Sequence, residues 1–241
     1  MPRFYLPPPL VVGDLLTLPE QVAHHVQVLR LPLGTTLTLF DGSGDDYFAT
    51  ITAIEKKRVT VDIKTVQSRS VELPYSITLA QALPEAAKMD WIIEKAVELG
   101  AAGITPLAAQ RCVVRLSAER AEKRAAHWLA VIIAASEQSG RNRLARLAPV
   151  IDFGRWIDQQ DLHRRILLTP RADQSLADWS RHQPAQAVTI MIGPEGGFSP
   201  DEERSAIQHG ALPLSIGPRI LRTETAGLAA LATLVAAWGE N

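Results

Sequence analysis

The first seventy residues alternate between apolar and polar positions in the way that β-strands do. Residues 35–40 and 47–54 show this pattern on either side of a turn, and residues 59–66 repeat it with a clear period of two. The turn, Asp41-Gly42-Ser43-Gly44-Asp45, is rich in residues that favour tight turns. Short strands joined by tight turns predict a small β-barrel.

The pattern changes after residues 67–74, a polar stretch that ends in Pro74. We therefore expect one domain over residues 1–72 and a second over residues 73–241. In the second domain, residues 89–99 place apolar side chains at helical spacing. Strand-like runs alternate with helical stretches, at residues 77–80, 104–107, 165–169, 187–192 and 212–216. Such alternation predicts an α/β domain with a mainly parallel sheet and helices on both faces.

Two predicted helices have clear amino-terminal signals. Residues 117–138 form a long helical stretch whose first residue, Ser117, suits the N-cap position. A later helix begins with Ser199 as N-cap, Pro200 at the first helical position and Glu202 at the third. This order predicts a capping box.

The charge of the chain is nearly balanced. Its 241 residues carry a net charge of −1, with 46% hydrophobic and 21% charged residues, so bulk charge indicates no partner. Residues 111–146 nevertheless contain eight Lys or Arg residues against three Glu residues. A solvated helix face and a patch for an RNA backbone would both explain this excess. We favour the patch because the rest of the chain is neutral.

The single cysteine, Cys112, excludes an intrachain disulfide and suits a reducing compartment. Its basic neighbours would allow a reactive thiol, but a small strand residue is the favoured interpretation. The pair His24-His25 lacks further ligands at metal-site spacing, so we expect a surface helix or turn and no metal.

No segment predicts contact with a membrane. The longest apolar stretch, residues 228–238, falls short of the ~20 residues that span a bilayer and predicts a buried helix. Pro7-Pro8-Pro9 interrupts any early apolar segment that could act as a signal peptide. We expect a cytoplasmic protein.

Two glycine-bearing segments near the C-terminus carry the strongest functional signal. Residues 190–199 and 215–226 each lead from an apolar run into a helical stretch. An α/β fold places its ligand at such strand-to-helix loops, where glycine lets the backbone approach a bound molecule. The first loop lacks the Lys-Ser/Thr pair of a phosphate-binding loop, and the chain has no GxGxxG motif. These absences argue against a Walker-type nucleoside triphosphatase and an ordinary dinucleotide-binding fold.

Arg222 is the residue that the second loop leaves unexplained. Thr223 or Thr225 could cap the following helix, and Glu224 suits the positive end of the helix dipole. A cation is unfavourable there. An anionic ligand, or negative charge that develops during a reaction, would explain Arg222.

The two loops together resemble those of the SPOUT class of S-adenosylmethionine-dependent RNA methyltransferases. Within that class, nearly the whole chain is similar to the 16S rRNA uridine-N3 methyltransferases. The other matching segments are residues 2–5, 24–30, 88–100 and 137–141, in consistent order.

The resemblance implies a PUA-like β-barrel followed by a SPOUT methyltransferase domain with a deep C-terminal trefoil knot. It also implies a homodimer that binds 16S rRNA across its interface, and three loops that hold S-adenosylmethionine mainly through backbone groups. The implied cofactor-binding residues are Leu168, Thr169, Pro170, Gly193, Pro194, Glu195, Gly196, Gly197, Ile216, Gly217, Ile220, Leu221, Thr223, Thr225 and Ala226.

The implied reaction is methylation of uridine N3, which must lose a proton before it attacks. We predict that Arg222 is catalytic and stabilises the charge that this loss leaves on the uracil oxygens. No general base stands out, because Glu195 and Glu224 each have a structural explanation and solvent could accept the proton. The predicted RNA-binding residues are Arg3, Arg30, Arg115, Arg141 and Arg143.

Two other functions remain open at this point. The chain could methylate another RNA position or a ribose 2′-hydroxyl. It could also be a non-catalytic RNA-binding assembly factor with a vestigial pocket, although such a pocket would need neither intact glycine loops nor Arg222.

Overall fold

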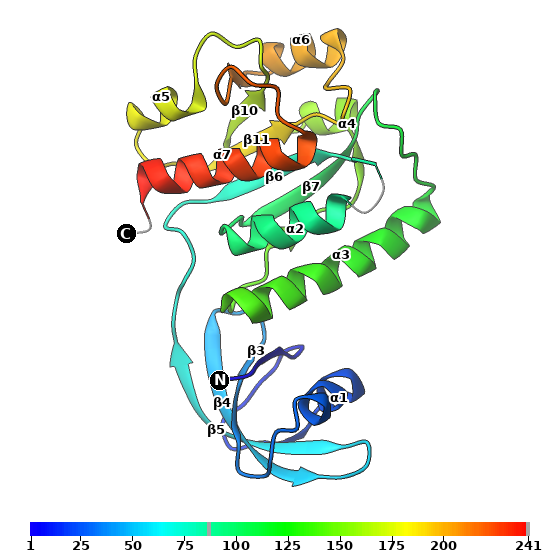
Figure 1. Ribbon diagram of the computed structural model, residues 1–241, viewed down its shortest axis with the longest axis vertical. Helices are drawn as coiled ribbons and strands as arrows, with labels where there is room; N and C mark the ends of the chain where they lie inside the picture. The colour runs from blue at the N-terminus through cyan, green and yellow to red at the C-terminus, as the bar shows by residue number, and fades with distance from the viewer. Residues whose placement is uncertain (86–87, 240–241) are drawn as a thin grey trace. The chain divides into compact units, whose positions relative to one another are not determined.

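The computed structural model describes residues 1–85 and 88–239 (Figure 1). The chain forms two compact units. One consists of Met1–Val71 together with Ser136–Leu144, and the other of Glu72–Ala135 with Ala145–Asn241. The first unit is therefore built from two separate parts of the chain.

The first unit contains a five-stranded sheet in the order β1-β3-β4-β5-β2. The strands are β1 (Arg3–Tyr5), β2 (Leu15–Thr17), β3 (Thr36–Phe40), β4 (Asp45–Ile54) and β5 (Val59–Ser68). The strands predicted at 35–40, 47–54 and 59–66 are confirmed as β3, β4 and β5, which pair antiparallel. Irregularities in β4 at Phe48/Ala49 and Ile51/Ala53 are of the kind that bend a strand around a core.

The core of this unit is apolar and is closed on one side by helix α1 (Glu20–Val28). Ala23 and Val26 of the helix are buried with Leu37 and Ile51 of the sheet. His24 and His25 lie in this helix, which was one of the two predictions for them, a surface helix or a turn. Among residues 1–85 and 88–239, no group of three His, Cys, Asp or Glu residues is placed to hold a metal ion.

The second unit contains a seven-stranded parallel sheet. Its main order is β12-β10-β11-β6-β7-β8, and β9 also pairs with β7. The strands are β6 (Ile77–Ala82), β7 (Gly103–Ala108), β8 (Arg146–Leu147), β9 (Ile151–Asp152), β10 (Arg164–Leu168), β11 (Val188–Ile192) and β12 (Leu212–Leu214). All five strand predictions for this domain are confirmed. The trefoil knot stays a prediction.

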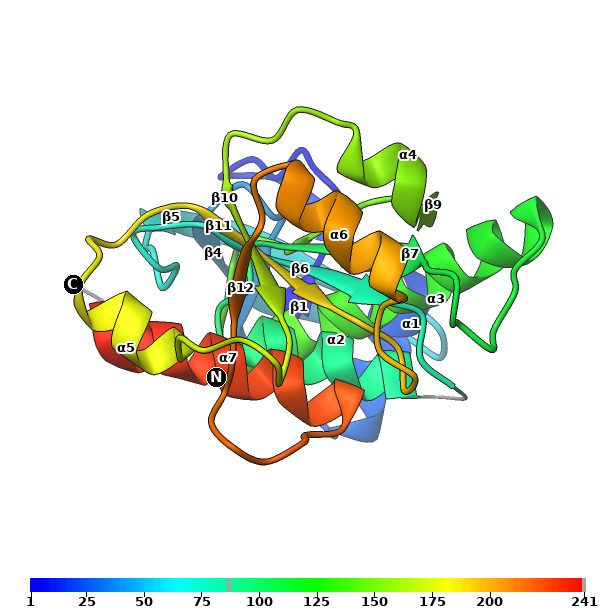
Figure 2. The same cartoon turned by 90° about the horizontal axis from the view of Figure 1, so that it is seen from above.

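Helices cover both faces of this sheet, as predicted (Figure 2). Helices α2 (Lys88–Glu98), α5 (Leu176–Arg181) and α7 (Thr223–Trp238) lie on one side, and α4 (Phe153–Ile157) and α6 (Pro200–Gln208) on the other. Helix α3 (Ala118–Ser139) is the longest, and its residues from Ser136 onward belong to the first unit. All residues of the central strand β11 are buried, as expected for a strand covered on both faces.

Local capping signals fix where the helices begin. The predicted capping box of α6 is present: Ser199 Oγ accepts from Glu202 N at 3.2 Å, and Ser199 N donates to Glu202 Oε2 at 2.8 Å. Ser117 Oγ likewise accepts from Arg120 N at 3.4 Å at the start of α3. This agreement shows that the sequence specifies these helix starts locally.

Two predictions about apolar residues need adjustment. Cys112 is buried as expected, but it follows a turn after β7 and is not in a strand. Burial raises the pKa of its thiol, which disfavours the reactive thiolate. Helix α7 is only partly buried, with Ala232 and Ala236 exposed. No helix within the described part of the chain is long and apolar enough to cross a bilayer.

Candidate active site

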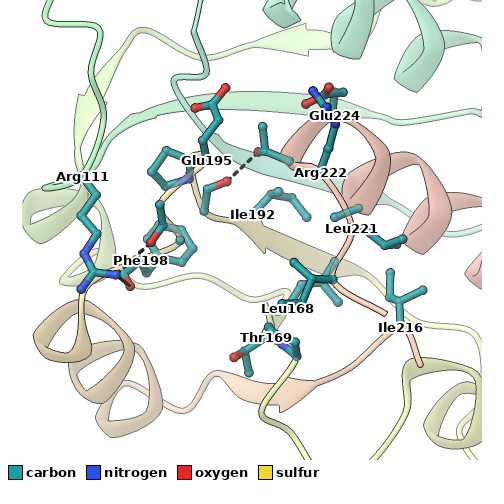
Figure 3. A pocket seen from close by; sticks show the side chains of 18 of the residues that line it. Arg111, Leu168, Thr169, Ile192, Glu195, Phe198, Ile216, Leu221, Arg222 and Glu224 are labelled. Carbon is teal, nitrogen blue, oxygen red and sulfur yellow. Dashed lines mark hydrogen bonds between the residues drawn. The ribbon is translucent and has the colours of Figure 1, made fainter. Parts of the chain in front are cut away.

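Three loops meet at the carboxyl ends of the neighbouring strands β12, β10 and β11. They enclose a cavity of about 540 Å³ (Figure 3). Every predicted cofactor-binding residue except Thr225 lines this cavity, and so does Arg222. The volume lies in the usual range for small-molecule sites, and the position at strand ends is typical of α/β folds.

Thr225 is the one predicted cofactor residue that the structure leaves outside. It is exposed on α7, two positions after Thr223. Two positions correspond to about 200° of rotation in an α-helix, so the two threonines point to opposite sides. The structure thus places Thr225 outside the cavity lining, and its contact with the cofactor stays a prediction.

The loop after β11 requires glycine at two positions. A Cβ atom on Gly193 would lie 2.7 Å from the backbone nitrogen of Phe198 and 2.9 Å from the carbonyl carbon of Gly197, so the loop folds tightly onto itself. Gly197 has a φ of +66°, in the left-handed region that favours glycine. The loop therefore presents its backbone, not side chains, to much of the cavity.

Thr223 joins the second and third loops. Its Oγ1 donates to the carbonyl oxygen of Gly193 at 2.6 Å and accepts from Gln81 Nε2 at 3.0 Å. The predicted capping by Thr223 or Thr225 is wrong, because Arg222 holds the N-cap position and makes no side-chain cap. The threonine hydroxyl fixes the neighbouring loop instead of the helix end.

Backbone hydrogen bonds tie the first loop to the third. Thr169 N donates to Leu214 O at 3.0 Å, and Leu176 N donates to Ser215 O at 2.8 Å. Ser215 N in turn donates to Gln174 O at 3.0 Å. The three loops thus form one connected frame around the cavity.

Two basic residues from more distant parts of the chain also line the cavity, and neither was predicted to do so. Arg111, after β7, donates to the carbonyl oxygen of Gly196 at 2.8 Å. Lys88, at the start of α2, donates through Nζ to Glu195 Oε1 at 2.6 Å. Both contacts fix the loop after β11 to other parts of the chain, the segment after β7 and the start of α2.

Glu195 is a paired carboxylate. Besides Lys88, the backbone nitrogen of Glu85 donates to its Oε1 at 3.1 Å. Burial pushes the pKa of Glu195 upward, but the hydrogen bonds from Lys88 and from backbone amides outweigh it and hold the pKa below its usual value. The bond to Glu195 also raises the pKa of Lys88. Both groups therefore stay charged at neutral pH.

Arg222 differs from these residues because its charge is not engaged. It is exposed, it lines the cavity, and no residue of the described ranges forms a hydrogen bond or ion pair with its guanidinium. Figure 3 shows Arg222 and Glu224 where helix α7 begins, with Arg222 at the N-cap position and Glu224 in the first turn. Its donors are free to meet a ligand.

The predicted RNA-binding arginines fall into two groups. Arg30, Arg115 and Arg143 are exposed. Arg30 lies beyond the end of α1 with a φ of +53°, and Arg115 donates to Gln110 O at 2.7 Å. These three side chains remain candidates for contact with phosphate groups.

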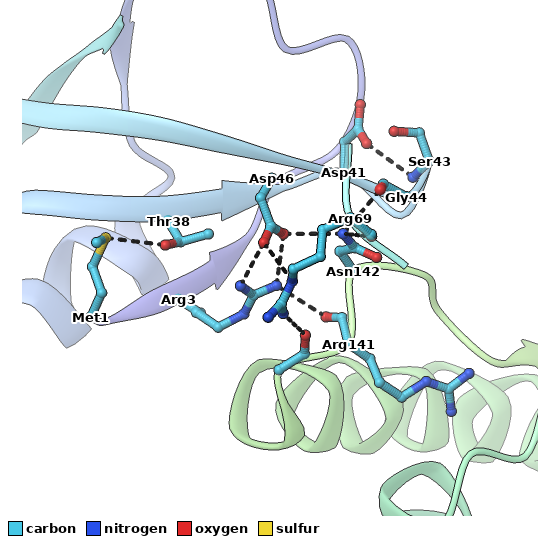
Figure 4. Close-up of polar contacts among 11 residues, drawn as sticks. Met1, Arg3, Thr38, Asp41, Ser43, Gly44, Asp46, Arg69, Arg141 and Asn142 are labelled. Carbon is cyan, nitrogen blue, oxygen red and sulfur yellow. Dashed lines mark hydrogen bonds and ion pairs between the residues drawn. The ribbon is translucent and has the colours of Figure 1, made fainter. Parts of the chain in front are cut away.

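Arg3 belongs to a structural cluster, which Arg141 contacts through its backbone carbonyl oxygen (Figure 4). Arg3 binds both carboxylate oxygens of Asp46, at 2.9 and 3.1 Å, and Arg69 Nε lies 3.3 Å from the same carboxylate. Asn142 Nδ2 also donates to Asp46, at 3.2 Å. Arg141 is 4% exposed. Arg3 is paired and Arg141 is buried, so this arrangement does not favour their predicted contact with RNA, which stays a prediction.

Comparison with known proteins matches two families to separate parts of the chain. The RNA methyltransferase domain family matches residues 71–235, and the RNA methyltransferase PUA domain family matches residues 18–64. A methyltransferase structure from Legionella pneumophila, solved with bound S-adenosylmethionine, is 40% identical with a TM-score of 0.93 and covers 100% of this chain and 99% of its own.

Two further relatives carry a more specific name. Ribosomal RNA small subunit methyltransferase E from Neisseria gonorrhoeae, solved with S-adenosylmethionine, is 38% identical with a TM-score of 0.91 and covers 99% of this chain and 98% of its own. The protein of that name from Buchnera aphidicola subsp. Schizaphis graminum is 30% identical over 100% of this chain and 98% of its own length. These matches over the full length show that the chain belongs to the ribosomal RNA small subunit methyltransferase E family.

Proposed function

We propose that this protein transfers a methyl group from S-adenosylmethionine to N3 of a uridine in 16S rRNA. The observation that carries the proposal is the cavity at the ends of β10, β11 and β12. It gathers the predicted cofactor residues of three separate loops beside the unpaired Arg222. Relatives that match the chain over its full length are named for small-subunit ribosomal RNA or hold this cofactor.

The residues that line the cavity suit S-adenosylmethionine. Leu168, Ile192, Ile216 and Leu221 supply apolar surface for an adenine ring, and the glycine loop supplies backbone groups for polar atoms. Such a mixture of apolar walls and few polar groups is typical of small-molecule sites. When bound, the cofactor supplies an electrophilic methyl group, so the protein's part is alignment and activation of the nucleophile.

Arg222 performs the activation in this proposal. Loss of the N3 proton spreads negative charge onto the two neighbouring uracil oxygens, and a guanidinium stabilises that charge more in the transition state than in the substrate. The guanidinium has no protein counter-charge to displace within the described residues, so its donors need no rearrangement before they meet uracil.

The predicted homodimer and RNA surface complete the proposal. Helix α7 is apolar on nearly all sides, yet Ala232 and Ala236 are exposed, which supports a second copy of the chain covering that side. Arg30, Arg115 and Arg143 are the proposed phosphate contacts. A ribosomal RNA substrate accords with the predicted cytoplasmic location.

Incubation of the purified protein with methyl-labelled S-adenosylmethionine and small ribosomal subunits that lack the modification tests the proposal. We expect label in N3-methyluridine on nucleoside analysis. Label in another nucleoside would keep the cofactor and replace the target. The absence of both label and cofactor binding would instead support a non-catalytic RNA-binding factor.

A further inference from the structure

Two carboxylates, Glu195 and Glu224, line the cavity near Arg222. Either could accept the proton that uracil N3 must lose, and the sequence does not distinguish them. The structure gives them different surroundings, and this difference assigns them different roles.

Glu195 is already occupied. Its Oε1 accepts from Lys88 Nζ at 2.6 Å and from Glu85 N at 3.1 Å. These bonds stabilise the ionised form, and the pKa of Glu195 lies below its usual value as a result. A carboxylate stabilised in this way is a weak base. Its bonds also join the start of α2 to the loop after β11, which is a structural task.

Glu224 has an unsatisfied oxygen. Its Oε2 is buried and has no hydrogen-bond partner among the described residues, and the ion pair with Lys88 Nζ, at 3.9 Å, is too long for a hydrogen bond. Leaving a buried acceptor unpaired is costly, so such atoms call for an explanation. A donor supplied by a ligand in the cavity would satisfy it once the carboxylate turns this oxygen toward the cavity.

The position of Glu224 relative to Arg222 matches the chemistry of uracil. Arg222 is the extended N-cap residue of α7 and Glu224 lies in its first turn, and both line the same cavity (Figure 3). Uracil presents a carbonyl oxygen, which accepts, next to N3–H, which donates. Cytosine has no hydrogen on N3. An arginine donor and a carboxylate acceptor that line one cavity can therefore complement the uracil edge and not the cytosine edge.

We propose that Glu224 recognises the target base as uracil by accepting its N3–H and then removes that proton as the methyl group is transferred. This inference rests on the proposed function. The N3–H bond breaks and the proton passes to the Glu224 carboxylate. The N3 lone pair bonds to the methyl carbon, the carbon–sulfur bond breaks, and its electron pair returns to sulfur. Glu224 later releases the proton to water.

Two substitutions separate recognition from proton removal. The amide of Glu224→Gln keeps an oxygen that accepts N3–H but cannot take the proton. We expect methylation to fall by about 10²–10⁴-fold, the usual contribution of a general base. The defect should shrink as pH rises, because N3 then loses its proton to solvent. Glu224→Ala removes the acceptor and should abolish recognition as well.

The second measurement is binding, which does not depend on turnover. Filter binding compares unmodified small subunits that carry uridine or cytidine at the target nucleotide. Wild-type protein and Glu224→Gln should prefer uridine by about tenfold, the value of one well-made polar contact. Glu224→Ala should lose that preference. Thermal unfolding and calorimetric binding of S-adenosylmethionine, both expected to match wild type, show that each variant is folded.

Glu195→Gln is the matched control, because it neutralises the other carboxylate of the cavity. A larger loss of turnover in Glu195→Gln than in Glu224→Gln, at equal cofactor affinity, would overturn the assignment. So would a preference for uridine that survives in Glu224→Ala. Failure of the proposed function looks different, because wild-type protein would then form no N3-methyluridine at all.

Discussion

Arg222 in the cavity and Arg3 in the first unit differ in whether a carboxylate neutralises the guanidinium. Arg3 is 14% exposed in its side chain and binds both oxygens of Asp46. Arg222 is exposed and has no charged partner among the described residues. The contrast teaches that the counter-charge decides the role: a paired guanidinium holds the fold, and an unpaired one is available to a ligand.

The polar groups around Arg3 and those around Arg222 differ in the same way as the two arginines. Asp46 is 4% exposed, accepts hydrogen bonds from Arg3 and Asn142 and forms an ion pair with Arg69, so its carboxylate is already fully engaged. The cavity around Arg222 is framed by backbone groups and keeps an unsatisfied oxygen on Glu224. Buried polar groups that hydrogen-bond to one another stabilise a fold. Buried polar groups without a partner indicate a binding site.

The strongest test of this comparison is Asp46→Ala. Removal of the carboxylate leaves Arg3 and Arg69 without their shared partner, and we expect the free energy of unfolding to fall by about 3–5 kcal/mol. Urea denaturation measures it. Lys64→Ala, which breaks the solvent-facing pair with Asp62, should cost less than about 1 kcal/mol. Equal losses in the two variants would remove the structural role assigned to Asp46.

Arg222→Ala tests the other side of the comparison. We expect turnover to fall by about 10²–10³-fold, or about 3–4 kcal/mol of transition-state stabilisation, with the affinity for S-adenosylmethionine unchanged. Steady-state kinetics and calorimetry measure the two quantities. Arg219→Ala is the control for charge lost from the same loop. An equal loss of turnover and cofactor affinity would contradict a role confined to catalysis.

The backbone frame of the cavity is tested by Gly193→Ala. The new Cβ would meet backbone atoms within 3 Å, so the loop must shift, and we expect cofactor affinity to fall about tenfold, or ~1.4 kcal/mol. Gly196→Ala is matched to it, because its Cβ would meet only the side chain of Arg111, at 3.5 Å. Calorimetry should show little change there. Similar losses would mean that any added methyl group is harmful.

The smallest expected effect separates the exposed arginine Arg143 from the buried arginine Arg141 by their contributions to RNA binding. Arg143→Ala should weaken RNA binding and reduce the slope of log affinity against log salt concentration by about 0.7–0.9, the contribution of one phosphate contact. Arg141→Ala should lower stability and leave that slope unchanged, because the residue is 4% exposed. Filter binding at several salt concentrations decides between them. A slope that changes only with Arg141 would reverse the assignment.

The sequence predicted the regular elements and the cavity because both depend on local signals. Period-two alternation predicted β4 and β5, and the Ser199–Glu202 capping box predicted the start of α6. Glycine loops after apolar runs predicted the cavity. The short strands β1 and β8 have too few residues to show a period.

The side-chain partners could not be predicted, because they come from distant parts of the chain. Lys88 reaches Glu195 across 107 positions, and Asn142 reaches Asp46 across 96. Nothing near Arg3 in the sequence indicates that Asp46 will neutralise it. A motif therefore identifies a basic residue but not whether its charge remains free, which is why Arg222 and Arg3 looked equally available.

The discontinuity of the first unit bears on how the chain is made. Asn142 and Glu137, which bond to Asp46 and to the backbone of Tyr5, follow residues 72–135 of the other unit. Because the chain is synthesised from its N-terminus, the polar cluster of the first unit cannot form completely until these residues have been made. A transplant of the barrel onto another protein would need residues 136–144 as well as 1–71. The first unit is therefore complete only after residues 72–135 of the second unit have been synthesised.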